Sequence, residues 1–132
     1  MTSDRARWVA RLLAGSRVAL GVTAIVVPTW PSRPWVGPEA HRPAVKLFAR
    51  SLGARDLAVG LGGVLALRHA GPVRGWVEAG GLCDAGDVAG TLVHFKDLPR
   101  VGRLVILAVA GGSLALSRWL APRVDAVATT PG

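Results

Sequence analysis

Residues 45–69 read VKLFARSLGARDLAVGLGGVLALRH. The part from Leu57 to Leu67 carries no charge, and a helix over the whole stretch, rising about 1.5 Å per residue, is long enough to cross about 30 Å of hydrocarbon. The adjacent charges Arg55 and Asp56 lie near its centre. Because a charged group inside a bilayer is costly unless it has a partner, this stretch is typical of a membrane span that packs against other polar helices.

Three further stretches have the same apolar character. Extending each uncharged run to the nearest helix breaker gives four predicted spans, at about 8–27, 45–69, 73–95 and 101–120. Prolines fill the first connection, and none of them falls within a predicted span. The predicted fold class is therefore all-α: an integral membrane bundle of four transmembrane helices with short loops, within residues 1–120. Residues 121–132 are expected to form a disordered tail.

The composition excludes several classes of protein. The chain has 132 residues, enough for one domain, of which 51% are hydrophobic and only 18% are charged. A small soluble domain is usually about a quarter charged, so this composition does not suit an ordinary soluble enzyme or a disordered chain. Cys83 is the single cysteine, which excludes an internal disulfide and a cysteine-based zinc cluster.

The five tryptophans lie at the ends of the predicted spans, as in the aromatic belts of membrane proteins. Trp8, Trp76 and Trp119 would share one membrane face, and Trp30 and Trp35 the other. Basic residues divide almost evenly between the two faces, with a small excess on the face that holds both termini. We therefore expect a multi-pass protein of the cell (plasma) membrane with both termini in the cytoplasm.

Ionisable residues near the middle of three predicted spans form a second pattern. They are Arg17, Arg55, Asp56, Asp84 and Asp87. A charge at the bilayer centre costs at least about 2.5–3.5 kcal/mol, so these side chains are expected to face one another. Two positive and three negative charges leave an excess of one negative charge. We therefore expect either Asp84 or Asp87 to hold a proton, unless Arg50 reaches the layer.

Small residues accompany these charges at helical spacing, which predicts faces on which helices can approach closely. The three faces are Ala10, Ala14, Arg17, Gly21 and Ala24 in the first span, Gly53, Asp56, Gly60 and Gly63 in the second, and Gly80, Asp84, Asp87, Thr91 and His94 in the third. The fourth span has small residues, including Ser113 and Ser117, but no charge at mid-depth. It is expected to be a packing helix.

Two sequence elements, GARD at 53–56 and DAGD at 84–87, carry a resemblance to a known family. With RSLGARDLAVGLG at 50–62, they resemble small actinobacterial-type four-helix integral membrane proteins of unknown function. The resemblance extends from the first span to the fourth. It implies the same fold and location and brings no activity with it.

Three functions are compatible with the charged layer. The main interpretation is a structural ion-pair network that fixes helix register. The alternative is a binding or acid/base enzyme site for an apolar, lipid-like molecule, with Asp84, Asp87, Asp56, Arg55 and Arg17 as candidate residues. A further alternative is proton-coupled transport by a homo-oligomer, and an accessory role in a larger complex also stays open. A ligand site should keep a cavity beside the aspartates, whereas a structural network should pair every carboxylate and leave no void.

The expected partners are the lipid bilayer, an apolar small molecule and a second copy of the chain. No nucleic acid is expected, because no basic helix face with interleaved aromatics lies outside the predicted spans. No cofactor or metal is expected either: His94 shares a face with Asp87 but lies about 10 Å further along the helix. Glu78 is expected to pair with Arg74 one helical turn before it.

Overall fold

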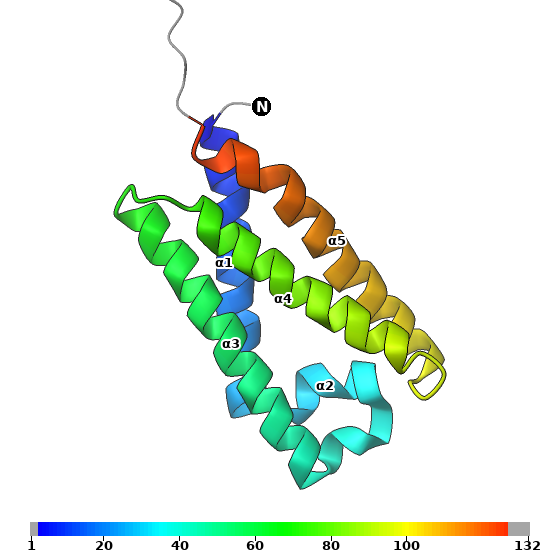
Figure 1. The fold of residues 1–132 in the computed structure, drawn as a ribbon. Coiled ribbons are helices and arrows are strands. Elements are labelled where there is room, and N and C mark those ends of the chain that lie inside the picture. The colour runs from blue at the N-terminus through cyan, green and yellow to red at the C-terminus, as the bar shows by residue number, and fades with distance from the viewer. Residues whose placement is uncertain (1–2, 127–132) are drawn as a thin grey trace, which may run out of the picture.

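The computed structural model describes residues 3–126, and these are helical almost throughout, with no strand among them. The elements are α1 (Ser3–Val26), α2 (Thr29–Val36), the 3-10 helix η1 (Gly37–His41), α3 (Pro43–Arg68), α4 (Arg74–Val93) and α5 (Arg100–Val124). The long helices form an elongated bundle, and α2 with η1 makes a compact turn at the end away from the termini (Figure 1). The predicted all-α class is confirmed.

The helices differ from the predicted spans at the start of α1, which begins at Ser3 and not near residue 8, in the first connection and at the end of α5. The first connection holds α2 and η1, which the sequence analysis did not predict because it treated the prolines only as helix breakers. Pro31 lies in the first turn of α2, where a backbone N–H has no acceptor within the helix and proline is tolerated. The prediction of a disordered tail is wrong for residues 121–124, which continue α5 because Ala121 and Val124 are buried. Residues 127–132 lie outside the described part of the chain.

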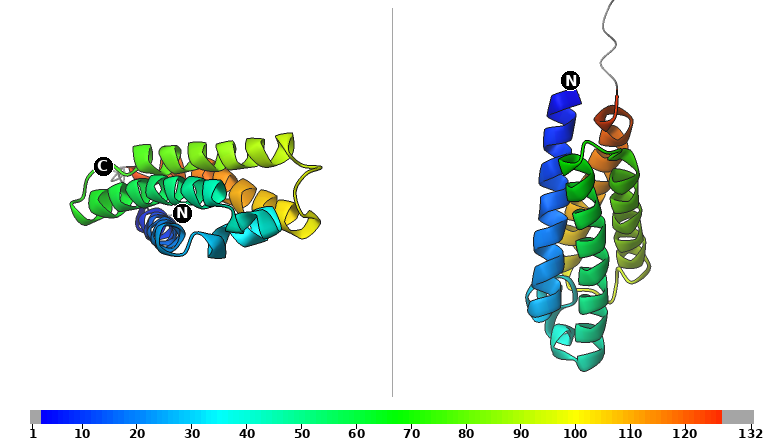
Figure 2. Two further views of the ribbon diagram at one scale, coloured as in Figure 1. Left: turned by 90° about the horizontal axis from the view of Figure 1, so that it is seen from below. Right: turned by 90° about the vertical axis from the view of Figure 1, so that its left-hand side faces the viewer.

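Helix α1 packs mainly against α3, and the two lie side by side in every view (Figures 1 and 2). Every residue of the predicted small-residue faces on these two helices is buried, which confirms both faces. A Cβ atom added at Gly21 would lie 2.6 Å from the carbonyl oxygen of Gly53 and 2.6 Å from the backbone nitrogen of Leu57. The two backbones are therefore in direct contact, which only glycine permits at this point.

Helix α4 packs mainly against α5, and a Cβ atom added at Gly81 would lie 3.0 Å from Ser117 Cβ. Where α4 begins, Asp125 accepts hydrogen bonds from the backbone N–H groups of Val73 and Arg74, each at 2.8 Å. This carboxylate also contacts Arg7 at 3.4 Å, so the two ends of the described chain lie together. The adjacent apolar core consists of Ala6, Ala10, Leu67, Val73, Val77, Leu120, Ala121 and Val124.

The surface is apolar and part of the interior is charged. Leu82 and Val93 on α4 are 75% and 78% exposed, whereas Arg17, Asp56 and Asp84 are each less than 8% exposed. This is the reverse of the distribution in soluble proteins. Two helices within residues 3–126, α1 from Asp4 and α5, are long and apolar enough to cross a membrane. They suggest membrane association, but they do not by themselves establish four spans.

Candidate functional site

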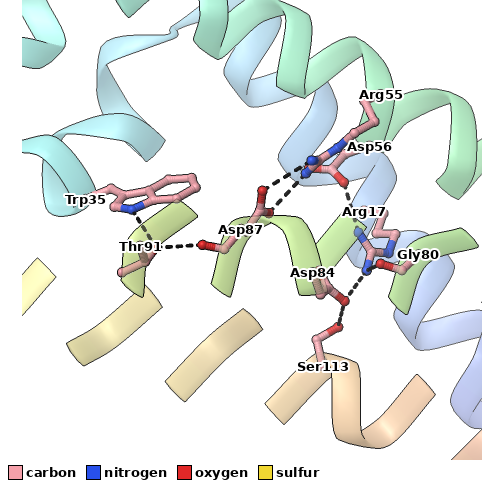
Figure 3. A network of polar contacts seen from close by, with 9 residues as sticks. All are labelled: Arg17, Trp35, Arg55, Asp56, Gly80, Asp84, Asp87, Thr91 and Ser113. Carbon is pink, nitrogen blue, oxygen red and sulfur yellow. Dashed lines mark hydrogen bonds and ion pairs between the residues drawn. The ribbon is translucent and has the colours of Figure 1, made fainter. Parts of the chain in front are cut away.

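Arg17, in the middle of α1, is the centre of a polar layer inside the bundle (Figure 3). Its Nη1 donates a hydrogen bond to Asp56 Oδ1 on α3 at 2.9 Å. Its Nη2 donates to the carbonyl oxygen of Gly80 at 2.8 Å and to Asp84 Oδ2, both on α4. Gly80 leaves room for the guanidinium, since a Cβ atom there would lie 2.7 Å from Arg17 Nε.

Arg55, on α3, forms the second half of the layer. Its two terminal nitrogens donate to the two carboxylate oxygens of Asp87 on α4, at 3.2 and 3.1 Å. Its Nη2 also lies 3.6 Å from Asp56 Oδ2. The structure thus brings together all five ionisable residues that the sequence places at mid-span, and every carboxylate among them contacts a guanidinium.

The layer joins the two helix pairs. The ion pairs Arg17–Asp84 and Arg55–Asp87 both link the α1–α3 pair to α4. Apart from these ion pairs, the α1–α3 pair and the α4–α5 pair make few contacts with each other. From α5, Ser113 Oγ donates to Asp84 Oδ2 at 2.7 Å. The sequence analysis included Ser113 only as a packing residue, because a serine among small residues carries no signal of its own.

Arg50 takes no part in this layer, because it is exposed and its Nε donates to the carbonyl oxygen of Ile25 at 3.1 Å. His94 is exposed as well, with Nδ1 3.7 Å from Asp97 Oδ2. Within residues 3–126 no three His, Cys, Asp or Glu side chains are arranged to hold a metal ion. The predicted pair of Arg74 and Glu78 is confirmed, with Arg74 Nε donating to Glu78 Oε1 at 2.7 Å.

A hydrogen-bonded chain connects α2 to the layer. Trp35 Nε1 donates to Thr91 Oγ1 at 3.2 Å, and Thr91 Oγ1 donates to the carbonyl oxygen of Asp87 at 2.7 Å. Trp35 therefore differs from its expected place in an outer aromatic belt, since it is partly buried and points inward (Figure 3). Trp30, at 71% exposure, does face outward.

A partly open cavity of about 430 Å³ lies beside the layer, on the side nearer α2. All five ionisable residues line it, with Ser16 and Ser113 as further polar groups. Most of the remaining wall is apolar and includes Leu20, Trp35, Leu52, Ile106 and Val109. Its volume falls within the range of about 300–1,000 Å³ that small-molecule sites occupy. The structure thus combines the features that were expected to distinguish the two main interpretations: paired carboxylates and a void beside them.

Comparisons with protein families, with curated proteins and with solved structures find no match for this chain. The resemblance to small actinobacterial-type membrane proteins therefore stays a prediction. What the site does has to be inferred from its own geometry.

Proposed function

We propose that this chain is a four-span integral protein of the cell membrane that binds an apolar small molecule in the cavity beside the Arg–Asp layer. The observation that carries the proposal is the cavity itself, which has apolar walls and a charged end at mid-helix. Arg17 and Arg55 hold the helix pairs in place, so the ion-pair network is the structural frame of the binding site.

The distribution of side chains supports the membrane location. Each long helix exposes large apolar residues, among them Leu12 on α1, Phe48 on α3, Leu82 on α4 and Val101 on α5. Water disfavours such a surface, whereas lipid chains solvate it. The shortest of these helices, α4, has 20 residues, which is sufficient for one span. With four spans, both ends of the described chain lie on one side of the membrane, and the small excess of basic residues there favours the cytoplasmic side.

The energetics of the cavity support an occupant. Apolar walls that meet no neighbouring atoms lose their dispersion contacts, so an opening of about 430 Å³ that stayed empty would be unfavourable. Water alone is a poor occupant of a largely apolar site because it finds too few hydrogen-bond partners there. An apolar molecule that enters from the bilayer is the occupant that fits these walls.

The test compares two substitutions within one turn of α5, on different faces of the helix. Ala110 lines the cavity, whereas Ala108 is exposed and does not line it. The wild-type chain and each variant are purified from native membranes, and bound molecules are identified by mass spectrometry of organic extracts. We expect a small apolar molecule to accompany the wild type and Ala108→Phe, and to be absent from Ala110→Phe because the phenyl ring fills the site. If nothing is enriched over an unrelated membrane protein, or if Ala110→Phe retains the molecule, the proposal is wrong.

A further inference from the structure

The charges around the cavity restrict the polar group that a ligand can carry. Five ionisable side chains line it, and Arg17 and Arg55 contribute +2 whereas Asp56, Asp84 and Asp87 contribute −3. The wall therefore carries one uncompensated negative charge when every group is ionised. In surroundings of low dielectric constant such an excess is costly, and either a proton on one aspartate or a bound cation in its place removes the cost.

The hydrogen bonds within the layer lead in the same direction. Both terminal nitrogens of Arg17 and both of Arg55 already donate to carboxylates, and the Ser113 hydroxyl donates to Asp84. Arg17 Nε lies against Gly80. Arg55 Nε has no partner, but neighbouring atoms cover it, so a ligand cannot reach it.

Two carboxylate oxygens of the layer lack a close hydrogen bond from residues 3–126. Asp84 accepts both of its hydrogen bonds at Oδ2 (Figure 3), and its Oδ1 accepts none from residues 3–126. Asp56 Oδ2 has only the 3.6 Å contact with Arg55. The polar end of the cavity therefore offers a ligand carboxylate oxygens without a hydrogen bond, which favour a ligand that donates one.

Trp35 forms part of the apolar wall of the cavity. It lines the same cavity from α2, and its indole nitrogen is held by Thr91. Thr91 lies seven residues, about 10 Å, beyond Asp84 on α4, so the indole ring lies beside the body of a ligand whose head is at Asp84. The apolar wall formed by Leu20, Leu52 and Ile106 suits the rest of such a molecule.

Building on the proposed function, we infer that the ligand is an amphiphilic amine, with an apolar body and one ammonium head that lies against Asp84 in the cavity walled by Trp35. The head supplies the donors and the positive charge that the layer lacks. The body replaces lipid chains along the apolar wall.

The experiment measures binding of three radiolabelled probes that each have ten carbon atoms in an unbranched chain: decylamine, decanol and decanoate. The full 132-residue chain is placed in nanodiscs of zwitterionic lipid, and the signal from empty nanodiscs is subtracted to remove partitioning into lipid. We expect decylamine to bind about tenfold more tightly than decanol. A charge-assisted hydrogen bond stabilises a complex more than a neutral one, and the difference corresponds to roughly tenfold in affinity. Decanoate is expected to bind least because the carboxylates repel it.

Asp84→Asn removes the negative charge at nearly constant shape. This substitution should bring the affinity for decylamine down to that for decanol and leave decanol binding unchanged. A persistent preference for the amine in Asp84→Asn overturns the assignment of the head to Asp84. The comparison of probes on the wild-type chain needs no variant, so it decides the ligand class even if Asp84→Asn does not fold.

The outcomes separate the two proposals. If decanol or decanoate binds the wild-type chain as tightly as decylamine, and Ala110→Phe abolishes that binding, the ligand class is wrong and the apolar site stands. If no probe binds above empty nanodiscs, both proposals are wrong.

Discussion

The Arg17 side chain determines how three helices meet. Its guanidinium contacts Asp56 on α3 and both Asp84 and the Gly80 carbonyl on α4, while the residue itself is only 7% exposed. A planar group with several fixed donors can serve partners on two helices at once, which the compact ammonium of lysine does less well. The layer is therefore organised around this residue.

Replacing this side chain should be strongly destabilising. Arg17→Met leaves Asp56 without its short hydrogen bond and Asp84 with only the Ser113 hydroxyl, so we expect the free energy of unfolding to fall by about 3–5 kcal/mol. Unfolding of the purified protein, followed by circular dichroism in mild detergent, measures the change. Arg11→Met is the matched control on the same helix, because Arg11 is exposed, and it should change stability by no more than about 0.5 kcal/mol. Equal losses in the two variants would contradict a special role for Arg17.

The membership of the layer could be predicted from sequence, but its pairing could not. Arg17, Arg55 and Asp84 stand out because a charge within an apolar stretch must find a partner. Which carboxylate meets which guanidinium depends on the rotation and crossing of helices, which spacing along one helix does not define. Ser113 and Asp125 gave no signal, since a serine among small residues and an aspartate beyond the last span are common in any sequence.

At the scale of elements, the contact between α1 and α3 depends on glycine. A Cβ atom at Gly21 would overlap backbone atoms of Gly53 and Leu57, whereas a Cβ atom at Gly15, on the same helix, would meet no atom within 4 Å. Backbone atoms cannot rotate away as a flexible side chain can. The two glycines of α1 are therefore expected to respond differently to the same substitution.

Gly21→Ala should lower the free energy of unfolding by about 1–3 kcal/mol, since the two helices must separate to accept the methyl group. Gly15→Ala should leave stability unchanged or raise it by about 0.5–1 kcal/mol, because alanine is the better helix former. Thermal unfolding in detergent of the two single variants measures both effects. A Gly21→Ala variant as stable as Gly15→Ala would show that the two backbones are not in contact.

Some elements follow from the sequence and others do not. The four long helices follow from long apolar stretches with breakers between them, and their packing faces follow from the spacing of small residues. Helix α2 is not predicted because Pro31 and Pro34 suggest a broken chain. Pro31 lies in the first turn, where a proline removes no helical hydrogen bond, but Pro34 lies inside the helix. The length of α5 was underestimated because burial of Val124, and not its local sequence, keeps the last turn helical.

At the scale of the whole molecule, the layer divides the bundle into two unlike halves. Towards the termini the helices close on an apolar core that includes Leu67 and Leu120, and towards α2 they enclose the cavity. The cavity could not be predicted from sequence, because it depends on how far apart the two helix pairs are held. The apolar surface, in contrast, follows directly from a composition that is 51% hydrophobic.

The exposed ends of the bundle allow the membrane arrangement to be measured. If all four long helices cross the membrane, Glu39 in η1 and Asp97 in the turn before α5 lie on one side, and His69 after α3 lies on the other. All three residues are exposed, so a cysteine at any of them is accessible to a reagent in water. Cys83 is the single native cysteine, and Cys83→Ser provides a background without other thiols.

The most direct test is therefore labelling of Glu39→Cys, Asp97→Cys and His69→Cys, in the Cys83→Ser background, with a membrane-impermeant maleimide. We predict that Glu39→Cys and Asp97→Cys react in intact spheroplasts, and that His69→Cys reacts only in inverted membrane vesicles. If His69→Cys reacts from outside and the other two cysteines react only in inverted vesicles, the four spans stand and the orientation is reversed. Reaction of all three cysteines from the same side would contradict the four-span arrangement, and with it a cavity that opens to the bilayer.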